Sequence, residues 1–140
     1  MLHIEPSILR SLIANVEPNP EECCGFFLGH VGATSCTITK SMAMNNSTAG
    51  NKQTNFEITS KDYLYTESIA EEENLALLGV YHSHLNHPAV PSEVDRLAAM
   101  PNFSYIIISV MDRKFDSIRS WQLDTHSQFQ EEKIIIDSLI

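Results

Sequence analysis

Basic residues are scarce in this sequence of 140 residues. Nine lysines and arginines stand against eighteen aspartates and glutamates, which gives a net charge of -9. Proteins that bind nucleic acid without regard to base sequence need a positive surface for the phosphates, and anionic membrane surfaces attract clusters of basic residues. The composition therefore argues against both nucleic acid and a membrane surface as partners.

Cysteine is also rare, and Cys23, Cys24 and Cys36 are the three present. An odd number with two adjacent members does not match the disulfide framework of a secreted domain. Residues 1–16 lack the positive charge and the unbroken apolar run of a signal peptide. No apolar run approaches the roughly 20 residues of a membrane-spanning helix. We therefore expect reduced thiols and a cytoplasmic protein.

The remaining composition is that of an ordinary globular protein, with 43% hydrophobic and 19% charged residues. A chain of this length is expected to form one domain over residues 1–140. Apolar residues at helical spacing predict a helix over 6–17, which Pro18 ends. Further helices are predicted from an N-cap at Ser60 to about residue 74, and over 92–100. Strands are predicted over 23–28, 35–44, 56–58, 75–83, 103–111, 117–123 and 129–137.

The order of these elements indicates the fold class. Strands interspersed with three helices in one compact unit predict an α/β domain, in which helices flank a mixed sheet. The first two of the longer strands follow each other closely and are expected to form a hairpin. The polar residues 45–55 are the least regular stretch between the elements.

The segment from Gly79 to Asp95 carries the strongest chemical signal. His82 and His84 lie two positions apart at the end of an apolar strand, so both rings are expected on one face of the sheet. Ser92 and Asp95 lie three positions apart at the start of a helix, which places them on one helical face. Two imidazoles and a carboxylate suit zinc, with a fourth position left to water.

Each half of this pattern also has a structural explanation. A histidine at the end of a strand is commonly a buried structural residue, and Ser92 with Asp95 matches a helix cap. The combined spacing, His-x-His-x7-Ser-x-x-Asp, is much rarer by chance than either half, and it favours a metal site. His87 lies in the intervening loop, where no strand or helix orients it, and is expected to be exposed.

The same spacing resembles the JAMM family of zinc metalloproteases, whose MPN domain carries this run of residues and a glutamate on an upstream strand. Residues 20–25, Pro-Glu-Glu-Cys-Cys-Gly, are similar to the family's glutamate segment and place Glu22 at the glutamate position. Glu21 is one residue away and is expected to face the other side. Leu85 departs from the family, in which a proline commonly follows the second histidine.

The resemblance implies a fold and a set of roles. The fold is a three-layer α/β/α domain with an architecture like that of cytidine deaminases. One zinc ion per chain would be held by His82, His84 and Asp95, with a catalytic water in the fourth position. Glu22 would move the proton of that water, and Ser92 would donate a hydrogen bond to the oxyanion.

The resemblance also implies a zinc-dependent peptidase or isopeptidase. Seven residues separate Asp95 from Phe103, so no large insertion follows the metal helix, and the chain resembles the minimal stand-alone prokaryotic form. Such forms are associated with ubiquitin-like proteins of the sulfur-carrier type, whose C-terminus is the expected cleavage site. The alternative is a non-catalytic MPN-type interaction module that binds zinc. The complete set of five residues argues against it.

The residues argue against two other enzyme classes. A thiol hydrolase with Cys24 as nucleophile is disfavoured, because Cys24 lies in the apolar run Cys-Gly-Phe-Phe-Leu, where a thiol is usually inert. A zinc nucleobase deaminase needs a Pro-Cys-x-x-Cys segment. The sequence contains no Cys-x-x-Cys, which excludes this class.

Overall fold

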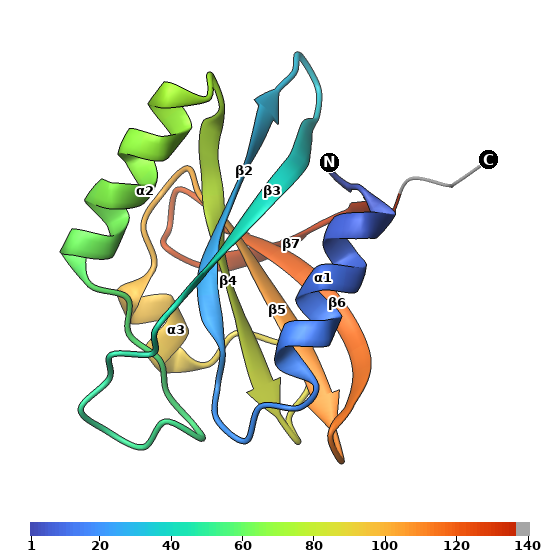
Figure 1. The fold of residues 1–140 in the computed structure, drawn as a ribbon, viewed down its shortest axis with the longest axis vertical. Coiled ribbons are helices and arrows are strands. Elements are labelled where there is room, and N and C mark those ends of the chain that lie inside the picture. The colour runs from blue at the N-terminus through green and yellow to red at the C-terminus, as the bar shows by residue number, and fades with distance from the viewer. Residues whose placement is uncertain (137–140) are drawn as a thin grey trace.

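The structure is a computed structural model, and it describes residues 1–136. The helices of this part of the chain are α1 (Pro6–Val16), α2 (Ser60–Glu72) and α3 (Glu93–Ala98). The strands are β1 (Leu2–Ile4), β2 (Cys24–Val31), β3 (Cys36–Met44), β4 (Ala76–Leu85), β5 (Ser104–Met111), β6 (Lys114–Leu123), β7 (Phe129–Glu132) and β8 (Ile134–Ile136). They form one mixed sheet of eight strands in the order β7-β6-β5-β4-β2-β3-β1-β8 (Figure 1).

The middle of the sheet is buried on both faces. β2 and β3 form the predicted antiparallel hairpin, and β4 lies between β2, its antiparallel neighbour, and β5, its parallel neighbour. Strands that are covered on both faces have continuous apolar runs instead of alternating ones. This accounts for the run Cys-Gly-Phe-Phe-Leu in β2 and for the three consecutive isoleucines of β5.

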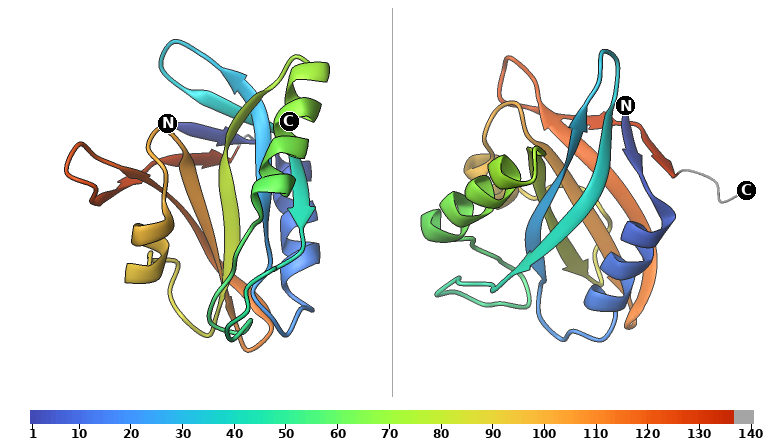
Figure 2. Two further views of the ribbon diagram at one scale, coloured as in Figure 1. Left: turned by 90° about the vertical axis from the view of Figure 1, so that its left-hand side faces the viewer. Right: turned by 45° about the horizontal axis from the view of Figure 1, so that its top comes forward.

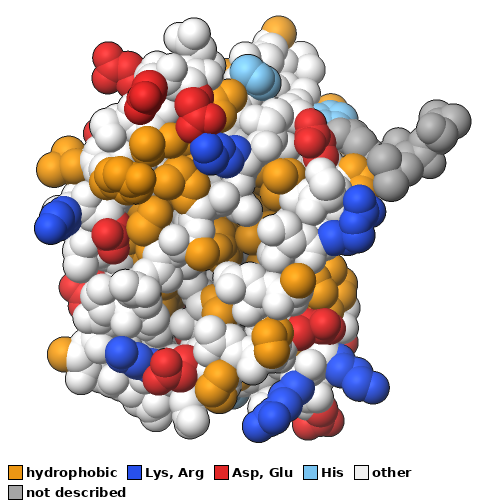
Figure 3. Space-filling model, in the orientation of Figure 1, with side chains coloured by type: hydrophobic (Ala, Val, Ile, Leu, Met, Phe, Trp, Pro, Cys, Tyr) orange, Lys and Arg blue, Asp and Glu red, His pale blue; other side chains and the backbone are white. Residues whose placement is uncertain are grey.

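Successive residues of β2 belong to different core clusters. Phe27 packs in the cluster that contains Leu12 and Val16 of α1. Its neighbour Phe26 packs in the cluster that contains Ala70 of α2. The two helices therefore cover opposite faces of the sheet (Figures 1 and 2). Figure 3 shows hydrophobic side chains gathered at the surface beside α2.

The last strands join the two edges of the sheet. β7 pairs with β6 at one edge and β8 pairs with β1 at the other, and Lys133 alone separates them in the chain. The backbone N–H of Leu2 donates to the carbonyl of Lys133 at 2.9 Å. The sheet therefore curls until its edges approach each other (Figure 2). The single predicted strand over 129–137 is wrong in this respect, and residue 137 lies outside the described residues.

The prediction of an α/β domain with a mixed sheet and flanking helices is confirmed. The finer expectation of a three-layer, cytidine-deaminase-like arrangement stays a prediction. Residues 56–58 form no strand, and Thr59, not Ser60, caps α2 by accepting a hydrogen bond from the backbone N–H of Asp62 at 3.1 Å. β1 was not predicted, because three residues are too few to show an alternating pattern.

No helix within residues 1–136 is long and apolar enough to cross the hydrocarbon layer of a membrane.

Close packing between β4 and its neighbours generates a test of the fold. A Cβ atom at Gly79 would lie 1.8 Å from the carbonyl oxygen of Ser104 and 2.8 Å from the ring of Phe27. We expect Gly79→Ala to lower the free energy of unfolding by about 1–3 kcal/mol, as overpacking of a core does, measured by urea denaturation.

Gly50→Ala is the matched control, because the nearest atom to its new Cβ, Thr48 Oγ1, lies at 3.6 Å. This exposed loop position should change the free energy of unfolding by less than about 0.5 kcal/mol. Equal stability of the two variants would contradict the tight β4–β5 contact.

Candidate metal centre and active site

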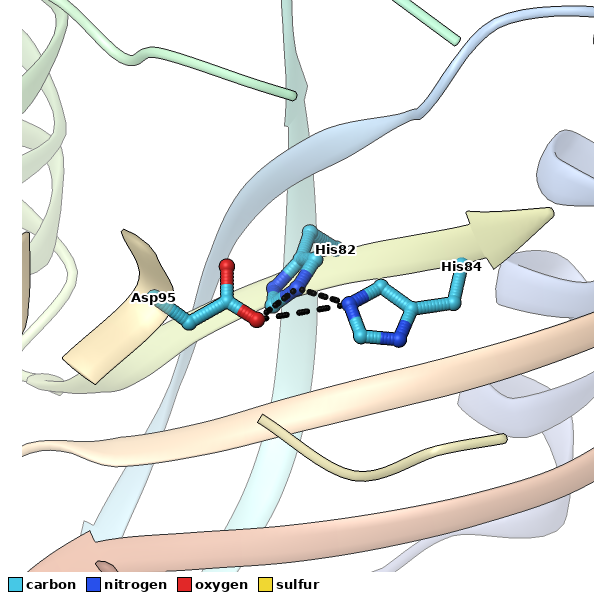
Figure 4. Close-up of side chains that lie close together, drawn as sticks. All are labelled: His82, His84 and Asp95. Carbon is cyan, nitrogen blue, oxygen red and sulfur yellow. Dashed lines mark hydrogen bonds and ion pairs between the residues drawn. The ribbon is translucent and has the colours of Figure 1, made fainter. Parts of the chain in front are cut away.

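Three electron-pair donors converge at one end of β4 (Figure 4). His82 Nε2 lies 3.1 Å from His84 Nε2, and Asp95 Oδ2 lies 3.3 Å from each of them. The two rings come from alternate positions of one strand and therefore share a face of the sheet. The structure thus brings together the three residues that the sequence singled out as candidate metal ligands.

Asp95 reaches the cluster from the first turn of α3. The hydroxyl of Ser92 accepts a hydrogen bond from the backbone N–H of Asp95 at 3.1 Å, and the N–H of Ser92 donates to Asp95 Oδ2 at 2.8 Å. This reciprocal pair is a capping box. The structural explanation of this pair is therefore correct, and the same carboxylate oxygen also faces the histidines. Ser92 is exposed, and because its oxygen acts here as an acceptor, its hydroxyl hydrogen remains available to donate.

The arrangement fits a zinc ion. Ligand atoms at about 2.0–2.1 Å from a tetrahedral zinc lie about 3.3–3.4 Å from one another, close to the 3.1 and 3.3 Å found here. Nitrogen lone pairs and a carboxylate oxygen are also the donor types that zinc takes. The three residues can therefore serve as ligands of a zinc ion.

His84 is held in the tautomer that a metal ligand needs. Its Nδ1 lies 2.9 Å from the carbonyl oxygen of Pro88. A carbonyl only accepts hydrogen bonds, so Nδ1 carries the proton and the lone pair of Nε2 faces the cluster. Burial lowers the pKa of His84, but the hydrogen bonds with Asp95 and Pro88 outweigh it and raise the pKa above its usual value.

His82 is the most deeply buried member of the cluster. Its ring stacks on Phe56 with the ring centroids 4.3 Å apart, and its Nδ1 is buried without a hydrogen-bond partner. Burial lowers the pKa of His82 and so favours the neutral ring. Burial opposes ionisation of Asp95 as well, but the hydrogen bonds to both histidines hold its pKa well below the usual range.

Glu22 lies just before β2 and is only 6% exposed, whereas Glu21 is exposed. Burial raises the pKa of Glu22 to about 7, with His84 lowering it and Asp95 raising it. The carboxyl is thus within electrostatic reach of the cluster, although Glu22 is not one of the three converging residues. A carboxyl with a pKa near neutrality can both accept and release a proton.

A pocket of about 500 Å³ opens beside His82 and Asp95. Its walls come from α2, α3, the extended residues 55–59 and the sheet. Most of its lining side chains are apolar, among them Phe56, Leu64, Val94, Met100 and Phe129. A concave apolar surface with a few polar groups at one end is typical of a ligand-binding site.

Two predictions about other residues are borne out. Burial raises the pKa of Cys24 to about 12, and its Sγ lies 3.8 Å from the carbonyl oxygen of Met44. Burial thus disfavours the thiolate, in line with the expectation of an inert packing residue. His87 is exposed and does not belong to the cluster.

Sequence reasoning missed two residues that shape the site. Phe56 was assigned to a strand but packs on the ring of His82. Asn46 lies in the irregular stretch 45–55, yet its Nδ2 donates to the carbonyls of Glu22 and Asn55 at 3.1 and 2.8 Å. Neither role leaves a local signal, because both depend on contacts with distant parts of the chain.

The fold and the cluster define an α/β domain with a candidate His-His-Asp metal centre beside a pocket. The family model described as prokaryotic homologs of the JAB domain matches residues 5–124. The chain belongs to this family, and the resemblance to JAMM proteins is thereby confirmed.

Curated relatives match nearly the whole chain. A desampylase from Pyrococcus furiosus is 28% identical over 136 residues, which cover 97% of this chain and 91% of the relative. A CysO-cysteine peptidase from Mycobacterium tuberculosis is 26% identical over 125 residues, which cover 88% of this chain and 83% of the relative.

Solved structures support the fold. A protein from Salinibacter ruber superposes with a TM-score of 0.74 at 32% identity, over 96% of this chain and 91% of that one. A protein from Desulfitobacterium hafniense gives a TM-score of 0.86 at 24% identity, over 100% of this chain and 95% of that one. At this identity the second likeness speaks for the fold alone.

The ligand geometry generates a prediction about metal content. Wild-type protein dialysed after zinc loading should keep about one zinc per chain, whereas His84→Ala should keep almost none, because three ligands become two. The variant should stay folded, because two apolar clusters form the core and the side chain of His84 belongs to the polar cluster instead. Elemental analysis and circular dichroism provide the measurements.

His87→Ala is the control, because it removes an exposed histidine three positions away. Its zinc content should equal that of the wild type. Unfolding of the His84→Ala variant at room temperature would show instead that the metal is structural.

Proposed function

We propose that this protein is a zinc-dependent peptidase or isopeptidase that cleaves an amide bond at the C-terminus of a ubiquitin-like protein. The observation that carries the proposal is the convergence of His82 Nε2, His84 Nε2 and Asp95 Oδ2, 3.1–3.3 Å apart, near a buried carboxyl, Glu22. This is the arrangement that metal-assisted hydrolysis requires: a ligand set and a separate proton carrier.

Membership of the JAB family and the names of the relatives support a hydrolase that acts on protein. One relative is named a desampylase and the other a CysO-cysteine peptidase. The proposed substrate, a ubiquitin-like protein of the sulfur-carrier type, follows the expectation for the minimal prokaryotic form. We further propose that the chain works as one domain in the cytoplasm.

The proposed chemistry divides between the metal and the side chains. His82, His84 and Asp95 would hold a zinc ion, which would supply Lewis-acid chemistry and lower the pKa of water at the site to about 7. Glu22 accepts a proton from the attacking water and returns it to the leaving nitrogen, as a general base and then a general acid. The exposed hydroxyl of Ser92 donates a hydrogen bond to the oxyanion that develops on the carbonyl.

The pocket beside the cluster has a role in this proposal. Its apolar walls from α2 and α3 take the chain of the substrate next to the scissile bond, and exclude water from one side of it. Removal of water strengthens the electrostatic interactions of Asp95 and Glu22 with the reacting groups.

The alternative, a non-catalytic interaction module that binds zinc, gives Glu22 no task. Burying a carboxyl costs free energy unless the group is paired. An interaction module gains nothing from the buried carboxyl of Glu22, whose pKa is raised to about 7. We therefore favour the enzyme.

The proton transfer by Glu22 generates the decisive prediction. Glu22→Gln should keep zinc content and stability near those of the wild type, because the amide has nearly the same size and Glu22 is not one of the converging ligands. Loss of a general base typically costs about 10²–10⁴ in rate, so kcat should fall at least 100-fold on that scale. The assay is cleavage of a fusion to the C-terminus of a ubiquitin-like protein.

Glu21→Gln is the matched control, because it makes the same chemical change at the exposed neighbouring position. Its activity should equal that of the wild type. Unchanged activity of Glu22→Gln would reject the mechanism. Loss of activity in Glu21→Gln alone would show that Glu21, and not Glu22, transfers the proton.

A further inference from the structure

The helix that carries Asp95 is not packed into the hydrophobic core. α3 is six residues long, and none of its residues is buried. The histidines, in contrast, lie on β4 in the middle of the sheet, where His82 is 1% and His84 8% exposed. Hydrophobic packing therefore fixes two of the three converging residues, and something else must fix the third.

The loop between β4 and α3 is attached to the sheet through three consecutive carbonyl groups, and this attachment positions the start of α3. The hydroxyl of Ser109 donates to the carbonyl of His87 at 2.6 Å, and His84 Nδ1 donates to that of Pro88 at 2.9 Å. The indole Nε1–H of Trp121 donates to the carbonyl of Ala89 at 3.0 Å. Ala89 is also 1% exposed, so the loop is anchored at this point.

The three donors stand on three neighbouring strands. His84 belongs to β4, Ser109 to β5 and Trp121 to β6, and His84 and Ser109 are direct partners in the parallel pairing of β4 and β5. Ser109 is fully buried, so its hydroxyl has a fixed place. The rigid sheet thus determines where the loop backbone passes, three residues before the cap Ser92.

The far end of α3 has a similar attachment. The backbone N–H of Met100 donates to the hydroxyl oxygen of Tyr105 at 2.6 Å, and Tyr105 is a buried residue of β5. Both ends of the short helix are therefore fixed to the sheet by polar contacts. These contacts, together with the hydrogen bond from Arg96 to the carbonyl of Ser127 at 3.2 Å, hold Asp95 between them, because no residue of the helix is buried.

We propose that Ser109 and Trp121 are positioning residues of the metal centre: they hold the carbonyls of His87 and Ala89 and so keep the carboxylate of Asp95 at ligand distance from the two histidines. The inference rests on the proposed zinc site. Groups that orient a ligand typically contribute 10–100-fold to metal affinity, and a contact made through the backbone belongs at the lower end.

The test measures zinc affinity and needs no substrate. Trp121→Phe removes the N–H donor and keeps an aromatic ring, and Ser109→Ala removes the hydroxyl. The dissociation constant of zinc is determined for each purified full-length variant by competition with a chromogenic chelator. We expect each variant to bind zinc about tenfold more weakly than the wild type, and the double variant to bind more weakly still.

Ser120→Ala is the matched control for a general loss of stability. Ser120 precedes Trp121 on β6, is fully buried, and donates its hydroxyl hydrogen to Glu132 Oε1 at 2.8 Å, away from the loop. Its removal should lower the thermal midpoint of the metal-free protein about as much as Ser109→Ala does, and leave zinc affinity unchanged.

The outcomes separate this inference from the proposed function. Wild-type zinc affinity in both Trp121→Phe and Ser109→Ala overturns the positioning role and leaves the metal centre standing. An equal loss of affinity in Ser120→Ala assigns the effect to stability and also overturns it. Absence of zinc binding in the wild type overturns the metal centre itself, and the inference with it.

Discussion

Two imidazole nitrogens and a carboxylate oxygen lie within 3.3 Å of one another, and this crowding of lone pairs is the constraint on which the site depends. Electron-pair donors at such distances repel unless a proton or a cation lies between them. The pKa of Asp95 is lowered, so its carboxylate keeps its negative charge. The pKa of His84 is raised, so the pair of Asp95 and His84 favours a bound positive charge. A divalent cation satisfies all three donors at once.

The sheet and its helices contribute to this cluster unequally. β4 is buried on both faces and presents His82 and His84 from a rigid support. α3 presents Asp95 from the surface. There the loop contacts and the capping box fix its position, since no residue of the helix is buried in the core. Such a division suits an open coordination site, because one side of the cluster faces the pocket that a substrate would enter. Precision there comes from directional hydrogen bonds, since dispersion contacts have little directional preference.

Glu22 illustrates how burial distinguishes adjacent residues of one type. Glu21 and Glu22 have the same side chain, yet only the second is enclosed, and its pKa rises to about 7. The hydrogen bond from Asn46 to its carbonyl and the bond from its N–H to the carbonyl of Lys52 hold this backbone between two loop segments. Residues 45–55, irregular in sequence, thereby help to fix the carboxyl near the candidate metal ligands.

The sequence by itself determined the parts of this protein that depend on local spacing. Alternation along a strand put His82 and His84 on one face, and a three-residue step put Ser92 and Asp95 on one turn of a helix.

Only the tertiary structure decided which distant segments meet. The pairing of Cys24 with His82 brings Glu22 near the cluster, and Phe56 packs on His82 from another segment. Ser109 and Trp121 bind the loop that precedes α3. The split into β7 and β8 likewise follows from the curl of the sheet. Such contacts leave no periodic trace, because they join residues far apart in the chain whose proximity depends on how the whole sheet packs.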